Sequence, residues 1–229
     1  MIIIFNYRKC MKKTFSASEA LRYGWELTKE HYLLIVGTAL IPALIQWVPT
    51  IIRSVLQFSY HSADQLPVML SLFLGVLGLI CGVLSSYASF GTTLIYLHLI
   101  GKEKTSLSDM FSPGGKLFLN YIIAAFISGF VTVVGLLLFI IPGIIFSIKF
   151  QYFALVILDK KLGAVEALKM SSKITDGVKM DLFAFGFLML LVNLGGLLLL
   201  GVGLLATIPM TTLAHIYVYR KLLAQTEAK

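Results

Sequence analysis

Charged residues are scarce in this chain of 229 residues: Asp, Glu, Lys and Arg make up 13% of it, whereas 58% is hydrophobic. Average soluble domains carry about 25% charged residues, which cover an apolar interior with polar surface. This chain lacks the polar surface that a water-soluble globule needs. The composition therefore indicates a protein that is surrounded by lipid over much of its area.

Catalytic motifs are also missing from the sequence. It contains no His-Glu-x-x-His, no Gly-x-Ser-x-Gly and no phosphate-binding Gly-Lys-Ser/Thr loop, and Gly114-Gly115-Lys116 is followed by Leu117. The two cysteines lie in a basic segment (Cys10) and in the middle of an apolar run (Cys81), so we expect no disulfide between them. We expect no metal, no cofactor and no enzymatic activity.

Long apolar runs are present instead, and several exceed the roughly 20 residues that cross a bilayer as a helix. Their boundaries predict six spans, with a tight turn at Pro142–Gly143 between the third and the fourth, at about 32–52, 67–100, 117–141, 142–158, 181–200 and 202–219. The predicted fold is all-α: a polytopic membrane protein with about six transmembrane helices in three hairpins. We expect an interfacial amphipathic helix before each hairpin.

Basic residues are confined to one side of this arrangement. Seventeen of the nineteen Lys and Arg fall in the two terminal segments and the two segments between hairpins, whereas Arg53 lies on the opposite side and Lys149 inside a span. The positive-inside rule then places both termini in the cytoplasm. Because these charges flank apolar spans, anionic lipid explains the net charge of +8 better than nucleic acid, which we do not expect as a partner.

The order of segments suggests a unit repeated three times. Glu19-Ala20-Leu21-Arg22 recurs as Glu166-Ala167-Leu168-Lys169, and Thr92-Thr93-Leu94 recurs as Thr211-Thr212-Leu213. We therefore predict a basic N-terminal tail at 1–15, one membrane domain at 16–222 with units 16–101, 106–158 and 163–222, and a C-terminal tail at 223–229. Residues 1–15 do not fit a cleavable signal peptide, because the apolar residues precede the basic ones; Met11 is an alternative start.

The segment from Pro142 to Gly177 carries a family resemblance. A Pro-Gly-Ile-Ile span ends near Asp159 and is followed by Glu-Ala-Leu-Lys-x-Ser-Ser, then Gly177, and then another hairpin. In this it resembles the YciC-like uncharacterised six-span bacterial inner-membrane proteins, and it is similar to the membrane domain of some glycerophosphodiester phosphodiesterases. The resemblance implies a bacterial cytoplasmic membrane and no established activity, since no soluble phosphodiesterase domain is present.

Lys149 is the most unusual single residue, because it lies within the fourth predicted span, which holds no acidic residue. An ammonium group at that depth costs several kcal/mol unless it finds a partner or extends to the interface. One interpretation is a site for a substrate or lipid headgroup formed with Gln151 and Asn193. The other is a lysine that reaches the cytoplasmic interface.

Two main functions remain open at this point. The first is a non-enzymatic inner-membrane protein in envelope or lipid homeostasis, which binds anionic phospholipid headgroups, a protein partner or a second copy of itself. Its membrane-surface basic residues would be Lys160, Lys161, Lys169 and Lys173. The alternative is a small transporter or channel with a path near Lys149, and an intramembrane lipid-modifying enzyme is a third possibility.

Overall fold

The computed structural model describes residues 13–60, 67–199 and 201–228, and these residues form helices and no strand. The all-α prediction is therefore confirmed. The helices, in chain order, are α1 (Ala17–Glu30), α2 (Tyr32–Tyr60), α3 (Val68–Ile100), the short 3-10 helix η2 (Leu107–Phe111), α4 (Gly115–Leu138), α5 (Ile140–Phe150), α6 (Phe153–Lys160), α7 (Ala164–Thr175), α8 (Lys179–Leu198) and α9 (Leu204–Glu227).

Five helical segments in the described part of the chain are long and apolar enough to cross a membrane: Tyr32–Phe58, Val68–Ile100, Gly115–Leu138, Ile140–Lys160 and Lys179–Leu198. They agree with the first five predicted spans and confirm a polytopic membrane protein. The sixth predicted span, 202–219, falls in α9, which is not among the five. Its last turns carry Arg220, Lys221 and Glu227.

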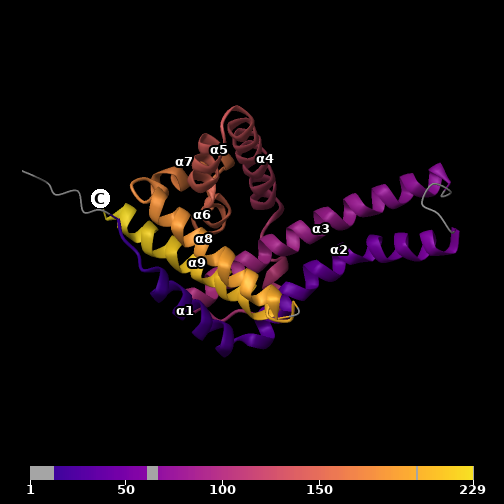
Figure 1. The fold of residues 1–229 in the computed structure, drawn as a ribbon, viewed down its shortest axis with the longest axis horizontal. Coiled ribbons are helices and arrows are strands. Elements are labelled where there is room, and N and C mark those ends of the chain that lie inside the picture. The colour runs from indigo at the N-terminus through magenta and orange to yellow at the C-terminus, as the bar shows by residue number, and fades with distance from the viewer. Residues whose placement is uncertain (1–12, 61–66, 200, 229) are drawn as a thin grey trace, which may run out of the picture.

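The three hairpins do not run parallel to one another. In Figure 1, α2 and α3 project together to one side, whereas α4 and α5 stand steeply away from them and α8 lies along α9. The projecting α2–α3 hairpin leaves large apolar side chains uncovered, such as Phe58 and Met69, which are 86% and 81% exposed. Apolar area of this kind is stable next to lipid and costly next to water.

The turn between α4 and α5 lies earlier than the sequence suggested. The chain reverses at Phe139, which is extended, and Pro142 sits in the first turn of α5. A proline is tolerated there because the first amide groups of a helix have no intrahelical acceptor. Gly143 instead allows close packing, since a Cβ at this position would overlap Leu136 of α4.

Two further boundaries differ from the prediction. The fourth predicted span, 142–158, is broken into α5 and α6 at Gln151–Tyr152. The C-terminal tail predicted at 223–229 is helical as far as Glu227, because α9 continues with Leu222 and Leu223 buried in the core.

The order of a short helix followed by a hairpin occurs three times, but the short helices differ. α1 and α7 are true α-helices of 14 and 12 residues, whereas η2 has only five residues, so a 3-10 turn stands where the second interfacial helix is predicted. All three have an acidic residue at the third position after the N-cap: Glu19, Asp109 and Glu166. The triplication itself stays a prediction.

The buried core lies where α1, α6, α7 and the later turns of α3 and α9 meet. Tyr152, Ile157, Ile174, Leu213 and Tyr219 are fully buried there. α1 crosses α9 at close range, because a Cβ on Gly24 would overlap the carbonyl oxygen of Met210. The best-packed part of the molecule is thus the region where these helices meet.

Candidate membrane-surface site

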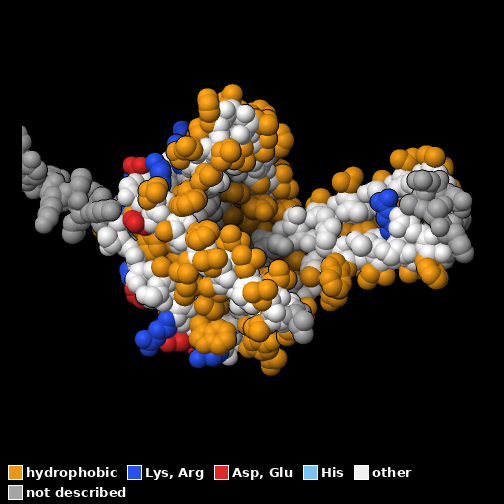
Figure 2. All heavy atoms as spheres, viewed as in Figure 1, with side chains coloured by type: hydrophobic (Ala, Val, Ile, Leu, Met, Phe, Trp, Pro, Cys, Tyr) orange, Lys and Arg blue, Asp and Glu red, His pale blue; other side chains and the backbone are white. Residues whose placement is uncertain are grey.

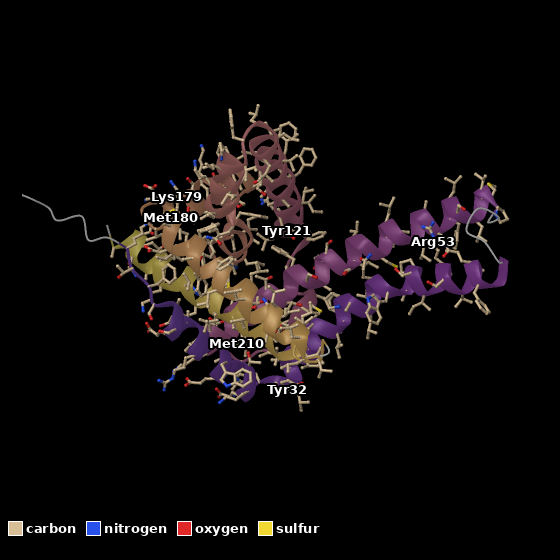
Figure 3. The ribbon with its side chains drawn as sticks, viewed as in Figure 1. Tyr32, Arg53, Tyr121, Lys179, Met180 and Met210 are labelled. Carbon is tan, nitrogen blue, oxygen red and sulfur yellow. The ribbon has the colours of Figure 1, made fainter. Side chains whose placement is uncertain are left out.

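Charged side chains gather at the end of the molecule opposite the tip of the α2–α3 hairpin. Figure 2 shows Lys and Arg over the body of the structure, with one further basic side chain on the projecting hairpin. Figure 3 identifies the latter as Arg53 and places Lys179 at the other end. The uneven distribution of basic residues along the sequence is therefore also an uneven distribution in space.

α7 presents two different sides at this charged end. Its apolar and small residues, among them Leu168, Ser171 and Ile174, are buried against the protein. Lys169 and Lys173 are exposed, one turn apart on the opposite side. The inner side of α7 is occupied by the protein core, so Lys169 and Lys173 lie on its outer, accessible side.

A polar cavity of about 350 Å³ adjoins this basic side and is lined by Lys13, Lys169, Ser172, Lys173, Asp176 and Thr226. The Lys13 ammonium group donates to the carbonyl oxygens of Lys173 and Ile174, at 2.6 and 3.1 Å. It thus caps the C-terminal end of α7, where the helix dipole favours a cation. A hydrogen bond from the Lys179 ammonium group, at 3.2 Å, lowers the pKa of the Asp176 carboxyl.

The four basic residues predicted at the membrane surface do not form one group. Lys169 and Lys173 share the α7 cavity, whereas the Lys160 ammonium nitrogen lies 2.6 Å from a carboxylate oxygen of Glu227. Lys161 ends α6 with a left-handed backbone (φ 54°) and lines a different cavity. Lys169 and Lys173 are therefore the pair best placed to act together.

The side chains of Lys149, Gln151 and Asn193, which the sequence predicts to form one site, make no hydrogen bonds to one another. The Lys149 ammonium nitrogen lies 6.0 and 5.9 Å from the ring centres of Phe146 and Phe150. The Asn193 amide donates to Thr211 at 3.2 Å, while the amide nitrogen of Gln151 is buried without a partner among the described residues. Lys149 lines neither of the two cavities mentioned above.

A second contact between distant segments joins α1 to α9 beside the charged surface. The Lys221 ammonium group and the Tyr217 hydroxyl group donate to the two carboxylate oxygens of Glu19, at 2.7 and 2.6 Å. The hydrogen bond from Lys221, followed by that from Tyr217, lowers the pKa of the Glu19 carboxyl. No sequence pattern indicates this contact or that of Lys13, because each joins residues more than 150 positions apart.

Comparison with known proteins gives limited further information. The chain is 32% identical over 155 residues to the uncharacterised protein Rv2560 of Mycobacterium tuberculosis, an alignment that covers 66% of this chain. It spans 45% of that relative's length, and the relative's name assigns no activity. No protein-family model matches the chain, and no solved structure matches it significantly. The likeness to YciC-like proteins stays a prediction. Fold, apolar helices and relative together define a membrane protein of unassigned function.

Proposed function

We propose that this is a non-enzymatic protein of the bacterial cytoplasmic membrane, in envelope or lipid homeostasis, and that the exposed basic side of α7 binds anionic phospholipid headgroups. Its charged end would face the cytoplasm, and its apolar hairpins would cross or enter the bilayer. The observation that carries the proposal is the placement of Lys169 and Lys173 on the outer side of a helix whose inner side is buried in the core.

The geometry of α7 favours binding without large conformational change. Lys13 holds the C-terminal end of the helix, and the core holds its inner side, so both lysines are carried by a fixed backbone. A basic side chain near an anionic membrane surface contributes about 1 kcal/mol. Two such residues supply a modest but selective attraction for anionic over zwitterionic lipid.

The orientation follows from the same charges. Basic segments next to spans are retained on the cytoplasmic side during insertion. In the described part of α2 and α3, Arg53 is the only Lys or Arg, and it lies towards the tip of the hairpin. The tip would therefore lie towards the outer leaflet, away from the anionic cytoplasmic surface.

The test is binding of phosphatidylglycerol to the purified protein in a neutral detergent, compared with phosphatidylcholine. Replacing both lysines, as Lys169→Gln with Lys173→Gln, should weaken phosphatidylglycerol binding by roughly tenfold or more at low salt, since each cation is worth about 1 kcal/mol. The difference should shrink as ionic strength rises, because salt screens exposed charges.

The matched control is Lys102→Gln with Lys104→Gln, which removes the same two charges outside the α7 cavity. This variant should bind phosphatidylglycerol nearly as the unmodified protein does. Equal losses in the two double variants would show that net charge alone attracts the lipid. Unchanged binding in the α7 variant would refute the proposed role of α7.

A further inference from the structure

A second polar cavity, of about 690 Å³, opens where the end of α3, the start of α4, the end of α6 and the last turns of α9 come together. Its volume is within the range of pockets that hold small molecules. It shares no lining residue with the α7 cavity. Its titratable lining side chains are those of His98, Glu103, Lys116, Asp159, Lys161 and Arg220.

The two acidic residues of this cavity already have partners on neighbouring side chains. Asp159 accepts from the Arg220 guanidinium at 2.9 Å and from the Tyr219 hydroxyl at 3.0 Å. Glu103 lies 3.6 Å from the imidazole nitrogen of His98. Lys116 and Lys161, by contrast, form no ion pair with a carboxylate in the described ranges. The two lysine ammonium groups of the cavity are therefore available to an anion.

Lys161 occupies a backbone conformation in which a side chain is unfavourable. Its φ of 54° is in the left-handed region at the end of α6, a position where glycine is the usual residue. Lys161 thus places a positively charged side chain at a position where replacement by glycine would relieve backbone strain. Lys102 has the same feature, with φ 58°, but it does not line this cavity.

The start of α4 adds hydrogen-bond donors to the same cavity. Gly114 is the N-cap and supplies no side-chain cap to this helix of 24 residues. A Cβ at Gly114 would meet nothing within 4 Å, so the first turn of α4 is open to an approaching group. Backbone amides at a helix start, together with the positive end of its dipole, suit oxyanions of phosphate type.

We propose that this cavity binds a phosphate group, held between the Lys116 and Lys161 ammonium groups and the first turn of α4. The group would belong to a small phosphorylated solute or to the headgroup of a phospholipid. Phosphate suits the cavity because it accepts several charge-assisted hydrogen bonds at once. The site is separate from the α7 surface, so each proposal can fail without the other.

The experiment uses the full chain in two arms. In the first, inorganic phosphate is titrated into the protein in a neutral detergent, and binding is followed by ³¹P NMR. In the second, the protein is placed in nanodiscs of phosphatidylcholine with or without phosphatidic acid, and retention of phosphatidic acid is measured. Each arm compares the unmodified protein with Lys116→Gln, Lys161→Gly and the matched control Lys102→Gly.

We expect saturable binding in at least one arm, at least fivefold weaker in Lys116→Gln and Lys161→Gly and unchanged in Lys102→Gly. The thermal midpoint of Lys161→Gly should not fall, since glycine suits its backbone, so weaker binding would not reflect misfolding. Lysine-dependent binding of inorganic phosphate supports a soluble ligand, and such binding of phosphatidic acid alone supports a headgroup. Binding in neither arm, or binding that survives Lys161→Gly, would overturn the proposal.

Discussion

Ser171 of α7 closes the break between α5 and α6 by bonding to Lys149. Its hydroxyl group donates to the Lys149 carbonyl oxygen at 2.9 Å and accepts from the Tyr152 amide at 3.2 Å. Two backbone groups that the interrupted helix leaves unpaired are thereby satisfied inside the core. The contribution of Lys149 to this contact comes from its backbone and not from its charge.

Ser171→Ala should therefore destabilise the protein. The substitution leaves the buried Tyr152 amide without a partner, at a cost of about 1–3 kcal/mol. Thermal unfolding in detergent measures the change. Ser172→Ala is the matched control, since the Ser172 hydroxyl makes no hydrogen bond within the described residues, and its midpoint should stay near that of the unmodified protein. Equal midpoints for the two variants would contradict the role of Ser171.

Lys149→Met should change stability very little. The ammonium group makes cation–π contacts with the rings of Phe146 and Phe150, and no hydrogen bond or ion pair of it is found among the described residues. Such contacts contribute about 0.5–1 kcal/mol each where water reaches them. Methionine keeps the apolar length of the side chain. The same thermal measurement applies here. A drop as large as that of Ser171→Ala would mean that the Lys149 charge has a partner essential to the fold.

The contact of Glu19 with Lys221 should make the docking of α1 sensitive to acid. The pKa of Glu19 is lowered in the folded protein, so its contribution is present above the unfolded value of about 4.3 and is lost as the pH falls through the folded value. We expect hydrogen-exchange protection of α1 to fall below about pH 4. Glu19→Gln should show weak protection already at neutral pH.

The control for this experiment is Glu26→Gln. Glu26 pairs with Arg22 within α1 itself, at 3.0 Å, and not with α9. In this variant, the hydrogen-exchange protection of α1 should match that of the unmodified protein at each pH. If Glu19→Gln keeps full protection at neutral pH, the contact does not hold α1 in place.

Gly91 of α3 has no room for a side chain. A Cβ at this position would overlap the backbone of Met110, a fully buried residue of η2. Gly91→Ala should lower stability by about 1–3 kcal/mol or more, because the packed backbone must move. Gly75→Ala, in the same helix but with open space around it, should be neutral or slightly stabilising. Comparable thermal midpoints for the two variants would contradict the close approach of η2 to α3.

The features that the sequence predicted well are those set by local composition. Apolar runs long enough for a bilayer gave the helical class and five spans, and α3 begins within a residue of the predicted start of the second span. The sequence also predicts that the basic residues gather at one end, because the basic segments alternate with hairpins along the chain. Predicting such features does not require knowing which distant segments are in contact.

The features that the sequence did not predict depend on contacts between distant segments. Lys13 lies in the predicted N-terminal tail and caps α7, and Lys160, one of the predicted membrane-surface residues, pairs with Glu227. Neither contact has a signal in the sequence. The apolar first half of α9 favours a span in the sequence, whereas its second half is buried as part of the core. The different directions of the hairpins in Figure 1 likewise have no signal in the sequence pattern.

The decisive measurement is the side of the membrane on which the charged end lies. In a Cys10→Ser, Cys81→Ala background, single variants Lys169→Cys and Arg53→Cys can be treated with a membrane-impermeant maleimide, in intact cells and in permeabilised cells. The account predicts labelling of Arg53→Cys in intact cells and of Lys169→Cys only after permeabilisation. Labelling of both positions from the same side, or of Lys169→Cys in intact cells, would contradict it.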